Sequence, residues 1–174
     1  MKRQLVRLAM AGAAMVLLSG NTGRPVPMQG SQPADNPNAA KDFTLKDLTG
    51  HDVTLSSFRG KKVVIMDFWA TWCGPCRMAM PSLARYWEKH KEQVEVLMIN
   101  QGEAPERVKA FVDSTKLPMR VLLDRDGSVS RAYRVYGIPT TFIVDKEGVL
   151  RARHTGFDPN MEAKLEEEIA PLLK

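Results

Sequence analysis

The sequence predicts a single α/β domain built around a mixed β-sheet and preceded by a tail. Short apolar runs of strand length alternate with helical patterns from about residue 62 to residue 136, as is typical of α/β proteins. A strand hairpin and a closing helix then follow, so antiparallel pairs are expected beside parallel ones. The length of 174 residues and the hydrophobic content of 44% suit one domain with an ordinary core.

The first half of the domain is expected to contain a hairpin, a buried strand and a long helix. The strand is the clearest element, because Val63-Val64-Ile65-Met66 is a continuous apolar run. A helical pattern follows, and Pro81 should kink that helix because proline lacks a backbone N–H donor. The expected elements are strands at 43–45 and 53–55 joined through Thr49-Gly50, a turn at 56–58, the strand at 62–69 and a helix at 73–91.

Proline and turn residues mark the elements of the second half. Pro105 stands at the first turn of an expected helix, and Asp158-Pro159 starts the closing helix. Lys146-Glu147-Gly148 separates the two strands of a hairpin. The expected elements are a strand at 94–99, a helix at 105–114, a strand at 120–123, a helix at 128–136, a hairpin of strands at 140–144 and 149–154, and a helix at 160–173.

The only two cysteines of the chain, Cys73 and Cys76, stand two residues apart where the buried strand gives way to the long helix. This spacing is typical of a redox pair. Cys73 would lie at the helix N-terminus, where unpaired amides and the helix dipole favour a thiolate, so we expect it to be the nucleophile. Cys76 would be buried one turn later and would attack the mixed disulfide on Cys73, releasing the partner in reduced form.

A structural disulfide and half of a zinc site are the alternatives for this pair. A disulfide across two intervening residues closes too small a loop to restrict the unfolded chain much. Zinc needs two more ligands, but no third cysteine exists, and His51, His90 and His154 show no paired spacing. We therefore favour redox exchange and expect neither a metal nor a cofactor.

Two segments in the same order resemble the thioredoxin superfamily. Asp67-Phe68-Trp69-Ala70 with Trp72-Cys73-Gly74-Pro75-Cys76 is similar to its active-site segment, and Tyr136-Gly137-Ile138-Pro139-Thr140-Thr141-Phe142 to its cis-proline segment. Three features favour the extracytoplasmic branch called TlpA-like or ResA-like. They are an export segment, an N-terminal extension of two short strands and a turn at 43–58, and an insertion at about 102–126. The resemblance, which covers about 41–174, implies a thioredoxin fold with a mixed central sheet, an N-terminal hairpin extension and one inserted α/β unit.

Asp67 is a candidate catalytic base. It stands on the buried strand six residues before Cys73, so burial should raise the pKa of its carboxyl and let it accept the Cys76 proton. The match to thioredoxin favours this role. The alternative is an aspartate at a strand end that faces solvent or caps a turn.

The candidate substrate-binding residues follow from the resemblance. It implies that Pro139 is cis and lies beside the cysteines, where the backbone of Ile138 pairs with the substrate. Trp72 would cover the site with an apolar face, next to Gly74 and Pro75. The alternative for Trp72 is a place in the core.

The first 40 residues have the pattern of an export segment and a linker. Lys2, Arg3 and Arg7 precede an apolar run at 8–18, so residues 1–20 are expected to be a signal peptide or a membrane anchor. The end of this segment resembles a lipoprotein signal, but Asn21 stands where the lipid-bearing cysteine would be. Residues 21–40, rich in Pro, Gly, Asn, Gln and Ser, are typical of a flexible linker, and residues 41–174 form the expected thioredoxin-like domain.

The net charge of +5 is concentrated in the tail. Four of the 25 basic residues and one of the 20 acidic residues lie in residues 1–40, so the remainder carries only +2. No basic stripe with interleaved aromatic residues is present. We therefore expect no nucleic-acid partner.

The resemblance implies a thiol-disulfide oxidoreductase that reduces exported proteins, apocytochrome c being the best-known client of the family. Electrons would come from a membrane thiol reductase of the CcdA or DsbD type, and we expect a monomer outside the cytoplasm, membrane-anchored or secreted. A Gly-Pro pair between the cysteines, with no histidine, is typical of the reducing, thioredoxin-like end of the scale. Many ResA-like chains have glutamates where Gly74 and Ala79 stand, so partner preferences tied to those carboxylates do not carry over.

Two other functions fit chains of this kind. A thiol peroxidase normally has an isolated cysteine ahead of this position, and this sequence has none. A Sco-type copper chaperone has a three-residue gap between its cysteines and a distant histidine ligand, for which His154 is the candidate. The two-residue gap argues against the copper chaperone.

Overall fold

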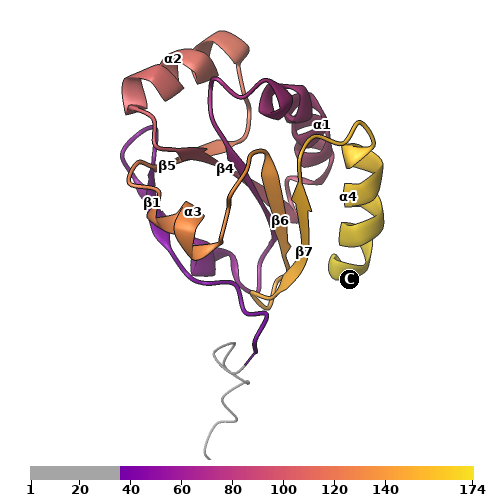
Figure 1. Ribbon diagram of the computed structural model, residues 1–174. Helices are drawn as coiled ribbons and strands as arrows, with labels where there is room; N and C mark the ends of the chain where they lie inside the picture. The colour runs from indigo at the N-terminus through magenta and orange to yellow at the C-terminus, as the bar shows by residue number, and fades with distance from the viewer. Residues whose placement is uncertain (1–35) are drawn as a thin grey trace, which may run out of the picture. The chain divides into compact units, whose positions relative to one another are not determined.

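The computed structural model describes residues 36–174, which form a seven-stranded sheet with helices on both faces (Figure 1). The strands are β1 (Thr44–Asp47), β2 (Asp52–Thr54), β3 (Val63–Trp69), β4 (Val94–Gln101), β5 (Arg120–Asp124), β6 (Thr140–Val144) and β7 (Leu150–Thr155). Their order in the sheet is β2-β1-β5-β4-β3-β6-β7. β4 pairs in parallel with β3 and β5, and the other pairs are antiparallel. The predicted mixed α/β class is confirmed.

Four helices accompany the sheet: α1 (Gly74–His90), α2 (Pro105–Thr115), α3 (Ser128–Ala132) and α4 (Met161–Ile169). α1 runs through Pro81 without ending there. α4 lies beside α1 (Figure 1), and an ion pair between Arg85 and Glu162 joins the two helices. The segment at 102–126, which the resemblance implied to be an inserted α/β unit, contains α2 and β5.

The two faces of the sheet carry separate cores, because side chains alternate along each buried strand. Ile65 and Trp69 of β3 pack on one face, together with residues of α1, α2 and α4. Met66 and Phe68 pack on the other face, with residues of α3 and the hairpin. By this alternation Asp67 lies on the α1 face of the sheet, the face that also carries Cys76.

Two helices are shorter than the sequence predicted. The helix expected at 128–136 ends at Ala132, and Arg134 has a φ of 52°, which is outside the helical region. The closing helix expected at 160–173 becomes a 3₁₀ turn at Ala170–Leu172. Pro171 lies in that turn, and it lacks the N–H that the next α-helical hydrogen bond would need.

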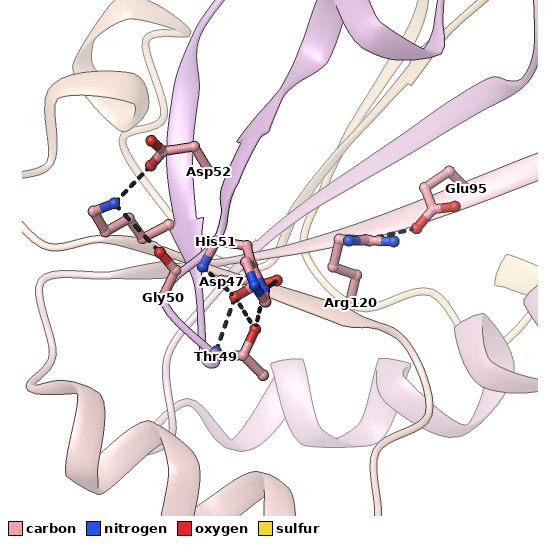
Figure 2. Close-up of polar contacts among 8 residues, drawn as sticks. Asp47, Thr49, Gly50, His51, Asp52, Glu95 and Arg120 are labelled. Carbon is pink, nitrogen blue, oxygen red and sulfur yellow. Dashed lines mark hydrogen bonds and ion pairs between the residues drawn. The ribbon is translucent and has the colours of Figure 1, made fainter.

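The predicted N-terminal hairpin is present and extends the sheet, because β1 pairs with both β2 and β5. Its turn is held by Asp47, whose carboxylate accepts hydrogen bonds from the backbone and hydroxyl of Thr49 and from the backbone of His51 (Figure 2). The His51 ring lies 2.7 Å from the Thr49 hydroxyl. His51 therefore has a local role in the turn.

The export segment predicted at 1–20, Asn21 and most of the linker predicted at 21–40 lie outside the described residues. Residues 36–40 are described, and they contact the sheet. Ala39 forms a β-bridge with Val149, and the N–H of Ala40 donates to the carbonyl of Gly148 at 2.9 Å. Packing thus begins a few residues before position 41. Within residues 36–174, no helix has both the length and the apolar character needed to cross a membrane.

Candidate active site

Cys73 caps the N-terminus of α1, directly after β3 and a three-residue loop. Its Sγ accepts a hydrogen bond from the N–H of Cys76 at 3.2 Å, and the two cysteines form a disulfide. After reduction, this N–H and the positive end of the helix dipole would favour a thiolate at Cys73. The predicted placement of the pair at a helix N-terminus is confirmed.

The two sulfur-bearing residues differ in their access to solvent. Cys76 is completely buried, whereas 5% of Cys73 is exposed at the edge of the site. A disulfide partner can therefore approach Cys73 but not Cys76. This asymmetry supports the predicted order of attack, in which Cys73 captures the partner and Cys76 releases it.

The loop before β6 brings the second motif to the cysteines. The peptide bond between Ile138 and Pro139 is cis, and the Ile138 carbonyl oxygen lies 3.8 Å from Cys73 Sγ. The loop is held at both ends: the Thr140 hydroxyl donates to the Gly137 carbonyl, and the Gly156 N–H donates to the Pro139 carbonyl. The predicted cis conformation of Pro139 and the position of this loop beside Cys73 are confirmed.

Each of the two motif segments carries an exposed aromatic side chain. Trp72 is 65% exposed, so the alternative that placed it in the core is wrong. Tyr136, two residues before Ile138, is 89% exposed. Pro75 is also exposed, in the first turn of α1, and Gly74 is half-buried beside it. Trp72, Gly74 and Pro75 adjoin Cys73 along the chain and provide surface that an extended peptide can contact.

Asp67 is fully buried in the middle of β3, so the alternative of a solvent-facing aspartate is wrong. Its Oδ1 accepts a hydrogen bond from the Thr141 hydroxyl at 2.7 Å, and its Oδ2 is buried with no hydrogen-bond partner among residues 36–174. Burial raises the pKa of the Asp67 carboxyl to about 7, although the Thr141 hydrogen bond acts in the opposite direction. A carboxyl with this pKa can exchange a proton near neutral pH.

Sequence reasoning missed a buried carboxylate that holds the loop before Cys73. Glu103 accepts hydrogen bonds from the Thr71 N–H at 2.7 Å, the Thr71 hydroxyl at 2.6 Å and the Asn100 side chain at 2.8 Å. Arg107 lies 3.1 Å from the same carboxylate. Burial alone would raise the pKa of Glu103, but these hydrogen bonds and Arg107 together lower it. An acidic residue just beyond the end of β4 was the signal in the sequence.

The match to known families agrees with this geometry. The model of the AhpC/TSA family matches residues 37–153. The chain belongs to the AhpC/TSA family. It is 41% identical to the thiol-disulfide oxidoreductase ResA of Geobacillus kaustophilus over 120 residues, which is 68% of each chain. It is also 34% identical to the thioredoxin-like protein YneN of Bacillus subtilis, over 90% of this chain and 96% of the relative.

Solved structures of family relatives have the same fold. A protein of Chlorobium tepidum assigned as the thiol:disulfide interchange protein DsbE superposes with a TM-score of 0.74 at 35% identity, over 79% of this chain and 96% of that one. The thioredoxin domain of a thiol-disulfide oxidoreductase from Bacteroides vulgatus superposes with a TM-score of 0.67 at 26% identity, over 74% and 94%. With the Cys73–Cys76 pair, these relatives show that the protein is a thiol-disulfide oxidoreductase with a thioredoxin fold.

Proposed function

We propose that the protein reduces disulfides in exported proteins. The observation that carries this proposal is the position of Cys73, whose sulfur lies at the edge of the cis-proline loop, 3.8 Å from the Ile138 carbonyl. An extended client segment can pair with that backbone while its disulfide meets Cys73. Trp72, next to Cys73 in the chain, and Tyr136, in the cis-proline segment, are exposed and can add apolar contacts. Such a surface suits a polypeptide better than a small thiol.

The Gly74-Pro75 pair supports the reducing direction. A strong oxidant of the DsbA type needs an unusually stable reduced form, which cationic groups near the thiolate provide. Neither residue between the cysteines carries a charge. The Cys73 thiolate is then stabilised mainly by the helix N-terminus, and the dithiol keeps its tendency to donate electrons.

The proposed client, electron donor and cellular location rest on the relatives and on the N-terminal sequence. The resemblance to ResA supports apocytochrome c as a client and a membrane thiol reductase of the CcdA or DsbD type as the electron donor. The basic and apolar pattern of residues 1–20 supports export, with the domain outside the cytoplasm as a monomer that is tethered or released.

The alternatives have weaker support. A peroxidase cysteine ahead of the pair is missing from the sequence. A copper ligand at position 154 would have to give up its present partner, because His154 Nε2 lies 2.8 Å from the Glu168 carboxylate. Copper titration of the reduced protein, followed by charge-transfer absorbance, is the direct check on the second alternative.

Trapping of clients tests the proposal. In a Cys76→Ala variant, the mixed disulfide on Cys73 cannot be resolved. Exported proteins should therefore accumulate as covalent adducts, which dithiothreitol reduces and releases. The matched control is the Cys73→Ala/Cys76→Ala double variant, which should form none. If the single variant traps only cytoplasmic proteins, or no more than the control, the proposed client class is wrong.

A further inference from the structure

Thr141 contacts the carboxylate of Asp67 from the neighbouring strand. The two residues are register partners on β6 and β3, and the Thr141 hydroxyl donates to Asp67 Oδ1 at 2.7 Å. Both side chains are buried. Because both side chains are buried, this hydrogen bond lies in a low-dielectric environment. It therefore stabilises the ionised carboxylate more than the same hydrogen bond would in solution.

No other described group compensates the charge of Asp67. Its register partner on the opposite side, in β4, is the apolar Met98. Within residues 36–174, the Thr141 hydroxyl is the one hydrogen-bond donor to this carboxylate, and Oδ2 has no partner. The ionised form of Asp67 therefore depends on Thr141 more than on any other side chain.

Titratable groups on this face of the sheet lie on α1, β7 and α4 and at the end of β6. On α1 these are the two cysteines and, further along, Tyr86 and His90. On β7, His154 is the register partner of Thr141, and on α4 its ring partner is Glu168. On β4 the residues of this face are the apolar Val94, Val96 and Met98, and on β6 Asp145 follows the strand and pairs with Arg151.

We propose that Thr141 is a positioning residue for thiol exchange, whose hydroxyl fixes Oδ1 of Asp67 and leaves Oδ2 to accept the Cys76 proton. This inference rests on the proposed role of Asp67 as the base. In the release step, the Cys76 S–H proton moves to Asp67, and the Cys76 thiolate attacks the Cys73 sulfur of the mixed disulfide. The Cys73–Cys76 bond forms and the bond from Cys73 to the client sulfur breaks. The client leaves as a thiolate and takes up a proton from water.

The direction of the effect follows from the charge states. A hydroxyl that donates to a carboxylate favours its ionised form, so loss of the hydroxyl raises the pKa of Asp67 above its value of about 7. We expect a rise of about one pKa unit, the effect of a single charge-assisted hydrogen bond. Asp67 must be ionised to accept the proton. Release should therefore become about tenfold slower at pH 6 and recover at high pH.

The test compares Thr141→Val, which removes the hydroxyl and keeps the shape, with Thr141→Ser, which keeps the hydroxyl. Carbon NMR titration of the Asp67 carboxyl gives its pKa without any activity assay. Stopped-flow reduction of a model peptide disulfide between pH 5 and 9 separates capture from release. Thr141→Val should raise the pKa and move the release profile to higher pH with capture unchanged, and Thr141→Ser should restore the parent values. If Thr141→Val does not fold, Thr141→Ala removes the same hydroxyl without filling the site.

The possible failures are distinguishable. If Thr141→Val leaves the Asp67 pKa and the release profile at the parent values, the role of Thr141 is wrong, whatever Asp67 does. If Thr141→Val raises that pKa but Asp67→Asn does not alter the pH dependence of release, the proposed base is wrong. In the double variant Asp67→Asn/Thr141→Val, release should equal that of Asp67→Asn alone. A further slowing would show that Thr141 acts independently of Asp67.

Discussion

Replacement of Cys73 by serine is expected to reduce disulfide exchange to the uncatalysed rate. Of the two cysteines, only Cys73 keeps any solvent exposure, so we expect a partner to meet it first, and a serine hydroxyl cannot form a disulfide. Replacement of Cys76 by serine should leave capture intact and stop the cycle at the mixed disulfide, because Cys76 supplies the second attack. Insulin reduction measures the turnover of each variant, and mass spectrometry with a peptide disulfide measures the adduct.

The two variants serve as controls for each other, because both remove the intramolecular disulfide. Any effect of that disulfide on stability is therefore shared, and only the order of attack differs. Adducts on Cys76 in the Cys73→Ser variant, at the rate at which Cys73 forms them in the Cys76→Ser variant, would show that the burial of Cys76 does not decide which sulfur attacks first.

Replacement of Asp67 by asparagine is expected to slow release by about a hundredfold, the lower end of what a general base contributes, and to leave capture nearly unchanged. In the parent, release should rise with pH through about 7, because the carboxyl must lose its proton before it can accept another. In the variant this dependence should vanish. Stopped-flow kinetics at several pH values give both steps. Equal release rates in parent and variant would make Asp67 a structural residue only.

The Asp67→Asn substitution should also stabilise the fold. Slower release together with a more stable fold would indicate a catalytic role for Asp67, whereas a structural role predicts a less stable fold. The pKa of Asp67 is 3.8 in an unfolded chain and about 7 in the folded protein, so the unfolded state loses this proton first as pH rises. The carboxyl therefore destabilises the fold progressively between about pH 4 and pH 7, by about 4 kcal/mol above pH 7. Asparagine carries no charge and can still accept the Thr141 hydrogen bond. Urea unfolding at pH 5 and pH 8 should show the larger gain at pH 8.

The sequence was informative where a pattern is local. β3 and the start of α1 could be predicted because an apolar run leads directly into the cysteine pair. The C-terminal end of α3 could not be predicted. It depends on the left-handed backbone conformation of Arg134, and arginine is not a residue type that marks helix ends. The burial of Asp67 followed from its neighbours in β3, all of which are buried.

The contacts that tune the site could not be predicted in the same way. Thr141 lies 74 residues from Asp67 in the chain, and only the register of β3 with β6 brings them together. Glu103 lies 32 residues from Thr71, and the path of the chain beyond β4 decides that it points back at the active-site loop. Both are polar residues at positions that, in the sequence alone, resemble ordinary strand and loop positions.

The reduction potential of the Cys73–Cys76 pair tests the central claim, that the protein works as a reductase, most directly. Equilibration against glutathione buffers, with the fraction of free thiols read by alkylation and mass spectrometry, gives this potential at pH 7. We expect a value close to that of thioredoxin, about −270 mV, because Gly74 and Pro75 leave the Cys73 thiolate without a cationic neighbour between the cysteines. A value close to that of DsbA, about −120 mV, would make the protein an oxidant and contradict the proposed function.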